Sequence, residues 1–236
     1  MKLPLFRLAV TLLAFNFNLY PCESQITKPN KYGARVIDDI EQYKKTVKAY
    51  PYKSMVDLGS FIPNIVIDLK YATDKNLMRK PLYKDKTAYV RFPVALKLWQ
   101  VQEELEELGY GLKVWDAYRP YFVTVEMYQK LNKNFVAHPK YGSIHNRGCA
   151  VDITIIDLAT GKELEMPTSH DQFSFRASHK CNYVSPKAVK NRELLRNIMI
   201  KHSFVPLEHE WWHYDFKLWR KYELLNLSFE ELRESE

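Results

Sequence analysis

The sequence has little glycine, little cysteine and no linker that would divide it. Among 236 residues there are only 7 glycines and 3 cysteines, and we find no internal repeat, low-complexity tract or Gly/Ser-rich stretch. At roughly 100–200 residues per domain the length allows one large domain or two small ones, and the missing linker favours one. With 46% hydrophobic and 14% aromatic residues, the composition excludes a disordered or collagen-like chain.

The positive charge of the chain is dispersed. Lys+Arg number 35 against 28 Asp+Glu, a net charge of +7, but no block of Lys and Arg is longer than two residues. Proteins dedicated to nucleic acids usually gather their basic residues into a patch or a stripe. We therefore expect no nucleic-acid partner.

Long apolar runs are absent except at the N-terminus. Residues 8–20 are mostly apolar, follow a basic start, and are too few to span a bilayer comfortably. Cys22 and Ser24 then offer a small-x-small cleavage site before Gln25, and this order is typical of a secretory signal. We therefore predict a signal peptide over residues 1–24, a mature chain of residues 25–236 without a membrane span, and export to the periplasm or the medium.

Two alternatives for this segment stay open. Cys22 could be the lipidated cysteine of a lipoprotein, although Pro21 stands where such a signal normally has Gly, Ala or Ser, and the run could also remain uncleaved as an anchor. The mature chain would keep Cys149 and Cys181. In an oxidising compartment these two can pair, but pairing needs Cα atoms within roughly 7 Å, and two separate buried thiols fit the sequence equally well.

Helical and extended patterns alternate along the mature chain. Apolar residues at three-and-four spacing predict helices, and alternation of apolar and polar residues predicts strands. The predicted helices are 38–50, 93–108, 120–131 and 191–202, and the predicted strands are 65–71, 112–116, 149–156 and 210–216. Helices and strands that interleave in this way predict an α+β domain around an antiparallel or mixed sheet.

The predicted strand 149–156 carries an acidic residue in its middle. The alternation puts Asp152 on one face of the strand, with only the small neighbours Ala150 and Thr154 beside it. An ionised carboxylate is expensive to bury without a compensating partner. A metal ion would be such a partner.

Two histidines complete the predicted metal site. His145, Asp152 and His213 would offer two nitrogens and one oxygen and leave a fourth tetrahedral position for water, which is the arrangement of catalytic zinc. We therefore predict one Zn2+ ion per chain, although manganese or cobalt could occupy the same ligands. His209 is a weaker candidate, because its position next to Glu210 would turn it to the other face of the predicted strand.

Glu210 and Arg119 are the candidate catalytic residues. Glu210 lies three residues before His213, so its carboxylate can sit beside a metal-bound water and take its proton as the water attacks a carbonyl. Arg119 follows a predicted strand and precedes a predicted helix, where its permanent charge can stabilise a tetrahedral intermediate. A purely structural salt bridge between Arg119 and Asp116 is the alternative.

These motifs together resemble a known family. The chain reads SxHxxGxAxD over 143–152, ExxH over 210–213, WDxYRP over 115–120 and YAT over 71–73. In this order, from about residue 65 to residue 216, they resemble the D-alanyl-D-alanine dipeptidases of the VanX type. The resemblance implies a zinc D,D-dipeptidase with the fold shared by D-Ala-D-Ala metallopeptidases and the Hedgehog signalling domain, a single α+β domain whose mainly antiparallel sheet is flanked by helices.

The resemblance also implies the roles of individual residues. The family's three metal ligands, its base and its intermediate-stabilising arginine fall on residues already singled out above: His145, Asp152, His213, Glu210 and Arg119. The serine that helps to hold the substrate carboxylate in the family corresponds to Ser143. The aspartate that meets the substrate amine corresponds to Asp171, helped by the backbone of Tyr71.

The chain departs from the family at three places that concern the fit of the substrate. The family's usual Gly-Thr-x-Phe-Asp reads PTSHD over 167–171 here, with His170 in place of the phenylalanine, and its continuation of YAT as Asp-Asn-Phe reads DKNL over 74–77. Further on, no tyrosine falls where a second carboxylate-binding tyrosine is expected, and Tyr83 or Tyr89 could replace it.

Three functions fit these observations. The leading one is hydrolysis of a free D,D-dipeptide, for which Asp171 would bind the amino group of the substrate. A D,D-carboxypeptidase or endopeptidase on peptidoglycan peptides is the first alternative, and the predicted export favours it because intact peptidoglycan lies outside the cytoplasm. A metal-binding module without catalysis is the second, and the presence of both Glu210 and Arg119 argues against it.

Overall fold

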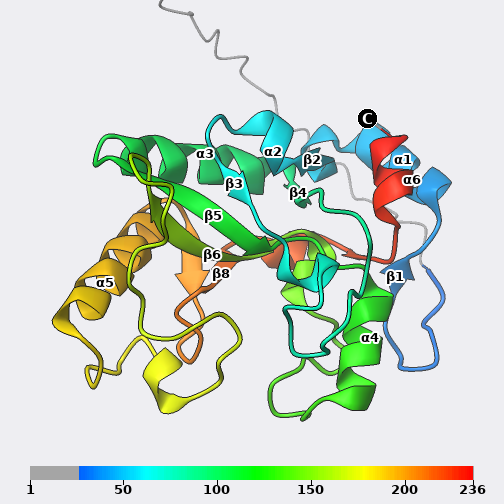
Figure 1. Ribbon diagram of the computed structural model, residues 1–236. Helices are drawn as coiled ribbons and strands as arrows, with labels where there is room; N and C mark the ends of the chain where they lie inside the picture. Colours follow the sequence, from blue (N-terminus) through cyan, green and yellow to red (C-terminus); the bar gives the residue numbers. More distant parts are fainter. Residues whose placement is uncertain (1–26, 236) are drawn as a thin grey trace, which may run out of the picture.

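The computed structural model describes residues 27–235, so the predicted signal peptide lies outside the described residues. At the centre is a five-stranded sheet with the strand order β3-β5-β6-β8-β7 (Figure 1). Its strands are β3 (Val66–Ile67), β5 (Tyr110–Asp116), β6 (Ala150–Asp157), β8 (His213–Phe216) and β7 (Phe204–Pro206). Only β3 and β5 run parallel, and the other three pairings are antiparallel. The predicted α+β domain with a mainly antiparallel sheet is confirmed.

The two faces of the sheet have different roles. In the register of β5 with β6, Leu112 pairs with Ile155 and Val114 with Ile153, and all four side chains are fully buried. Helices α3 (Phe92–Glu106) and α5 (Pro186–Lys201) contact each other and the sheet, and their apolar residues join the same core (Figure 1). Since neighbouring residues of a strand point to opposite faces, Asp152 is directed away from these helices.

Smaller elements surround this centre. The remaining helices are α1 (Ile40–Ala49), α2 (Leu58–Phe61), α4 (Tyr121–Lys130) and α6 (Phe229–Arg233). Two further sheets have two strands each: β1 (Val36–Ile37) pairs with β9 (Leu224–Leu225), and β2 (Met55–Asp57) pairs with β4 (Tyr89–Arg91). These short strands were not predicted from the sequence, because two or three residues are too few to show a period.

Two predicted strands are shorter than expected. The predicted strand 65–71 is a strand only at Val66–Ile67, and Tyr71 lies in a 3-10 turn, Lys70–Ala72. The predicted strand 210–216 begins only at His213, because the backbone N–H of His213 donates to the carbonyl of Glu210 at 3.0 Å and closes a turn.

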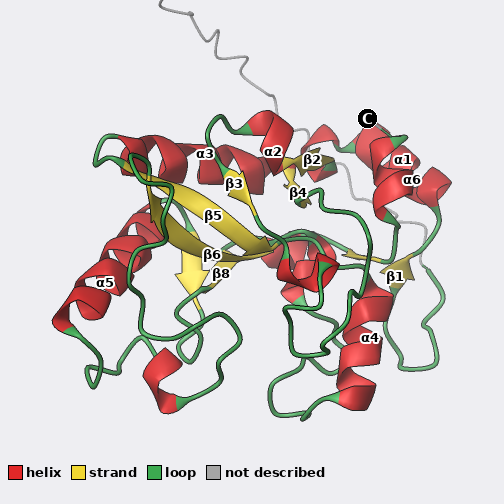
Figure 2. Cartoon of the chain, in the orientation of Figure 1, coloured by secondary structure: helices red, strands yellow, loops and turns green. Residues whose placement is uncertain are grey.

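The last long helix starts earlier than predicted. α5 begins at Pro186 instead of Asn191, with proline in its first turn, and the Ser185 hydroxyl accepts a hydrogen bond from the N–H of Ala188 at 3.0 Å. Serine before proline is a strong start signal for a helix. Before α5, a long segment that is mainly loop leaves the end of β6 and includes residues 158–185 (Figure 2).

Two open questions from the sequence concern cysteines and membranes. Cys149 and Cys181 are both buried and free, so they are the two separate thiols of the sequence analysis. Within residues 27–235 no helix combines the length and the apolar character that crossing a membrane requires.

Candidate active site

Three elements bring the predicted metal ligands together. His145 lies in the 3-10 turn Ile144–Arg147, Asp152 in β6 and His213 at the start of β8. Asp152 and His213 are directly paired in the antiparallel register of β6 and β8, and residues paired in this way point to the same face. The local fold therefore places a carboxylate and an imidazole side by side, and the turn adds the second imidazole.

The turn that carries His145 is fixed at both ends. Ser143 caps it in a capping box with Asn146, which satisfies two otherwise free backbone N–H groups. Gly148 ends it with a φ of +66°, and a Cβ atom at this position would lie 2.7 Å from the Met55 side chain. Only glycine fits here without strain, so the passage from His145 into β6 depends on this residue.

The three candidate ligands form a compact, buried set. Nδ1 of His213 lies 3.0 Å from Oδ1 of Asp152, and Nε2 of His145 lies 3.3 Å from Nδ1 of His213 and 3.5 Å from Oδ1 of Asp152. The ligand atoms are all within 4.8 Å of one another, and the residues are 1%, 4% and 9% exposed for His145, Asp152 and His213. Two nitrogens and one oxygen that converge in this way fit a divalent transition metal.

The outer nitrogens of both histidines have acceptors, which orients the rings. Nδ1 of His145 lies 2.7 Å from the carbonyl oxygen of Ala117, and Nε2 of His213 lies 2.9 Å from Oδ1 of Asp215. A carbonyl or carboxylate oxygen can only accept, so both outer nitrogens act as donors, and the two inner nitrogens are the ones that a metal would have to bind. Outer partners of this kind typically support histidine ligands of metals.

Asp215 was not selected from the sequence, although its position relative to His213 indicates a supporting role. It follows His213 by two residues in the same strand, and residues at that spacing share a face. A carboxylate beside a candidate ligand histidine on one strand face is therefore a detectable pattern.

Arg119 is held rigidly beside this set. Its Nε lies 3.1 Å from Oδ2 of the fully buried Asp116, and its guanidinium lies 5.0 Å from the centre of the Tyr71 ring. Burial lowers the pKa of the guanidinium, but the carboxylates of Asp116 and Asp152 outweigh this effect, and the net shift is upward. The salt bridge considered from the sequence is present, and it keeps Arg119 a fixed cation that lines the cavity.

Glu210 reaches the site from the turn before β8. The hydrogen bond from His213 N–H to its carbonyl defines this turn, and both side chains line the same cavity. Burial raises the pKa of the Glu210 carboxyl above its usual value, His213 opposes the shift, and the carboxylates of Asp152 and Asp171 add to it. A carboxyl with a raised pKa next to a candidate metal is typical of a general base.

Asp171 and Tyr71 meet through their side chains. The hydroxyl of Tyr71 donates to Oδ2 of Asp171 at 2.7 Å, a contact that the sequence analysis, which considered the backbone of Tyr71, did not anticipate. Asp171 has a φ of +58°. Aspartate tolerates this left-handed conformation better than most residues, and such conformations concentrate at functional sites.

A single cavity of about 710 Å³ joins these residues. Its lining includes all eight residues selected from the sequence: His145, Asp152, His213, Glu210, Arg119, Ser143, Asp171 and Tyr71. Tyr83 and Tyr89, the suggested replacements for a carboxylate-binding tyrosine, are buried in the core instead. Tyr141, two residues before Ser143, lines the cavity.

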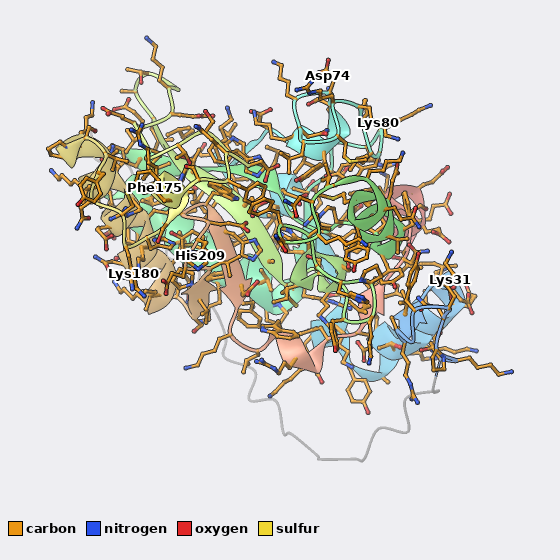
Figure 3. The ribbon with its side chains drawn as sticks, turned by 90° about the horizontal axis from the view of Figure 1, so that it is seen from below. Lys31, Asp74, Lys80, Phe175, Lys180 and His209 are labelled. Atoms are coloured by element: carbon orange, nitrogen blue, oxygen red, sulfur yellow. The ribbon has the colours of Figure 1, made fainter. Side chains whose placement is uncertain are left out.

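His209 is not part of the site. It is exposed and lies on the same side of the molecule as Phe175 and Lys180 (Figure 3). His209 was ranked below His213 because it would face the other side of a predicted strand, but it lies in the turn before β8, so strand alternation does not apply to it.

Comparisons with known proteins identify the family of this chain. The family model of peptidase M15, described as D-ala-D-ala dipeptidase, matches residues 52–223, a range that contains every candidate site residue. The chain therefore belongs to the M15 family of D-Ala-D-Ala dipeptidases, and the resemblance found in the sequence is confirmed. It is a peptidase of this family.

Individual relatives are similar over most of their length. The chain is 32% identical over 181 residues to a D-alanyl-D-alanine dipeptidase of Enterococcus faecalis (strain ATCC 700802 / V583), covering 66% of this chain and 88% of the relative. It is 31% identical over 172 residues to a D-alanyl-D-alanine dipeptidase of Escherichia coli (strain K12), covering 72% and 89%. Among solved structures, the LdcB LD-carboxypeptidase is similar at 19% identity and a TM-score of 0.41, covering 77% of this chain and 78% of that one.

Proposed function

We propose that this chain hydrolyses the D-Ala-D-Ala dipeptide with the help of a zinc ion held by His145, Asp152 and His213. The observation that carries the proposal is the convergence of these three buried side chains on one point of the cavity. The other residues that such a hydrolysis needs line the same cavity. Two relatives that are 32% and 31% identical to this chain are D-alanyl-D-alanine dipeptidases.

The residues divide the work of hydrolysis. When bound, zinc supplies Lewis acidity that lowers the pKa of a coordinated water. Glu210 takes a proton from the attacking water as the new C–O bond forms, and then gives it to the amine nitrogen as the C–N bond breaks. Arg119, fixed by Asp116, stabilises the negative charge that develops on the carbonyl oxygen.

The two ends of the dipeptide need opposite partners. Asp171 would bind the free amino group, and the Tyr71 hydroxyl keeps one of its carboxylate oxygens in place. Ser143 would help to bind the substrate carboxylate from the start of the turn that carries His145. A free dipeptide has both charges, so these contacts select it over peptides that lack one of them.

A comparison of two substrates tests this proposal. The zinc-loaded chain from residue 25 is incubated with D-Ala-D-Ala and, separately, with N-acetyl-D-Ala-D-Ala, and released D-alanine is measured. We expect release from the free dipeptide. Release mainly from the acetylated compound would make the protein a carboxypeptidase, and no release from either with zinc bound would make it a metal-binding module.

A second cavity favours the carboxypeptidase as the second candidate. This cavity, of about 1010 Å³, shares Leu77 and Asp171 with the first. A peptide extended beyond the scissile dipeptide at its amino end could pass Asp171 and enter it. Under this candidate Asp171→Asn would leave hydrolysis of the acetylated substrate unchanged, whereas a dipeptidase would lose activity on the free one.

We further propose that the protein is exported after removal of residues 1–24. The support is the order of a basic start, a short apolar run and small residues. Mass spectrometry of the N-terminus of the protein recovered from outside the cytoplasm tests it. A chain that starts at Gln25 is expected, and an acylated Cys22 at the N-terminus would make the protein a lipoprotein instead.

A further inference from the structure

His170 contacts the oxygen of Asp152 that faces away from the other ligands. Oδ1 of Asp152 faces the inner nitrogens of His145 and His213, whereas Oδ2 lies 3.1 Å from Nε2 of His170. A carboxylate can only accept, so Nε2 of His170 is the donor. The side chains of His170 and Asp152 are only 7% and 6% exposed, so water cannot easily replace this contact.

The His170 ring is held in place from several sides. Its centre lies 5.2 Å from that of Trp115, 5.7 Å from that of Trp212 and 6.3 Å from that of Tyr71. The loop that carries it is tied to the turn before β8, because Nε1 of Trp211 donates to the Thr168 hydroxyl at 2.9 Å. The ring is therefore preorganised to donate to Asp152, as a supporting residue of a site must be.

The same ring also faces the candidate amine-binding residue. Nδ1 of His170 lies 3.6 Å from Oδ2 of Asp171, the oxygen that accepts from Tyr71. One imidazole thus stands between a candidate metal ligand and a candidate substrate-binding carboxylate.

We propose that His170 is a positioning residue for the metal site: its hydrogen bond to Oδ2 of Asp152 holds the carboxylate so that Oδ1 alone faces the metal. This inference rests on the proposed zinc site. A phenylalanine at this position would have no donor for Oδ2.

Zinc affinity in the absence of substrate is the test. The dissociation constant is measured by competition with a chelating dye for the chain from residue 25, which contains every described element, and for His170→Phe and His170→Gln. Partners of ligands typically change metal affinity by about 10–100-fold when lost, and we expect a weakening in this range for His170→Phe. His170→Gln should stay within about threefold of the original chain, because its amide nitrogen can occupy the place of Nε2 and keep the donor.

A matched control and a spectroscopic measurement exclude a general loss of structure. His202→Phe removes another histidine with a carboxylate partner, Oε2 of Glu104 at 2.8 Å, and should leave zinc affinity unchanged. In the cobalt-substituted protein, the visible absorption of His170→Phe should differ from that of the original chain, since a released Oδ2 can join Oδ1 on the metal, and His170→Gln should restore the original spectrum. If His170→Phe does not fold, His170→Asn replaces it, because its shorter amide cannot reach Oδ2.

The outcomes separate this inference from the proposed function. Equal zinc affinity and equal cobalt spectra in the original chain, His170→Phe and His170→Asn would overturn the positioning role while leaving the peptidase proposal intact. If His170→Phe binds zinc more weakly than the original chain, and the original chain binds zinc but releases no D-alanine, the positioning role is supported and the proposed function is overturned.

Discussion

Replacing Glu210 by glutamine should separate catalysis from metal binding. The side chain keeps its shape and loses its ability to take a proton, and the ligand set of His145, Asp152 and His213 does not include it. General base catalysis contributes typically about 10²–10⁴-fold, which corresponds to about 2.7–5.4 kcal/mol of transition-state stabilisation. We expect kcat to fall in that range and zinc binding to stay intact.

The variant should also fold as well as the original chain. A carboxyl whose pKa is raised in the folded state is costly to ionise there, so at pH values above that pKa it reduces stability. Burial and the neighbouring carboxylates raise the pKa of Glu210, and a neutral glutamine removes this cost. The urea midpoint of Glu210→Gln at neutral pH should therefore equal or exceed that of the original chain.

The assay pairs metal content with turnover. Zinc per chain is measured after dialysis, and D-alanine release from D-Ala-D-Ala is followed on the same samples, with His145→Ala as the comparison that should lose both. Equal loss of zinc in the two variants would refute the reasoning, because Glu210 would then be a ligand. Undiminished turnover in Glu210→Gln would refute its role as the base.

Three further predictions concern the surroundings of the site. Asp215→Ala should weaken zinc binding about 10–100-fold, because it removes the acceptor that orients His213; a dye-competition titration measures this, and an unchanged affinity would deny Asp215 a supporting role. Tyr71→Phe should raise KM for D-Ala-D-Ala about 10–100-fold at unchanged kcat, because a hydrogen bond to a charged group such as Asp171 contributes about 1.5–3 kcal/mol. Steady-state kinetics measure both constants, and a lower kcat at constant KM would argue against a binding role. Gly148→Ala should reduce the free energy of unfolding by about 1 kcal/mol or more, because φ is +66° and a Cβ would lie 2.7 Å from the Met55 side chain. An unchanged urea midpoint would show that alanine fits this position without strain.

The long elements and the candidate ligand set could be predicted from the sequence because their signals are local. The apolar spacing of 93–108 gave a helix that the structure has at Phe92–Glu106, and the alternation of 149–156 gave the strand that carries Asp152. The three ligands have residue types and motif spacing that are visible without knowledge of the fold.

The features that the sequence analysis missed depend on contacts between distant segments. β1 and β9 pair with only two residues each, almost 190 positions apart, and no period appears over so short a length. His170 lies in the long loop after β6 and contacts Asp152. From the sequence alone it was noted only as a departure from the family motif. The strand predicted over 210–216 starts three residues late, at His213, because the carbonyl of Glu210 closes a turn there.

Titration of the metal-free chain with zinc tests the central claim most directly. D-Alanine release from D-Ala-D-Ala is measured as zinc is added stepwise, and bound zinc is determined in the same samples. The account predicts that activity rises in proportion to bound zinc and reaches its plateau at one ion per chain. Full zinc occupancy of the site without release of D-alanine, or release that continues after a chelator has removed the metal, would contradict it.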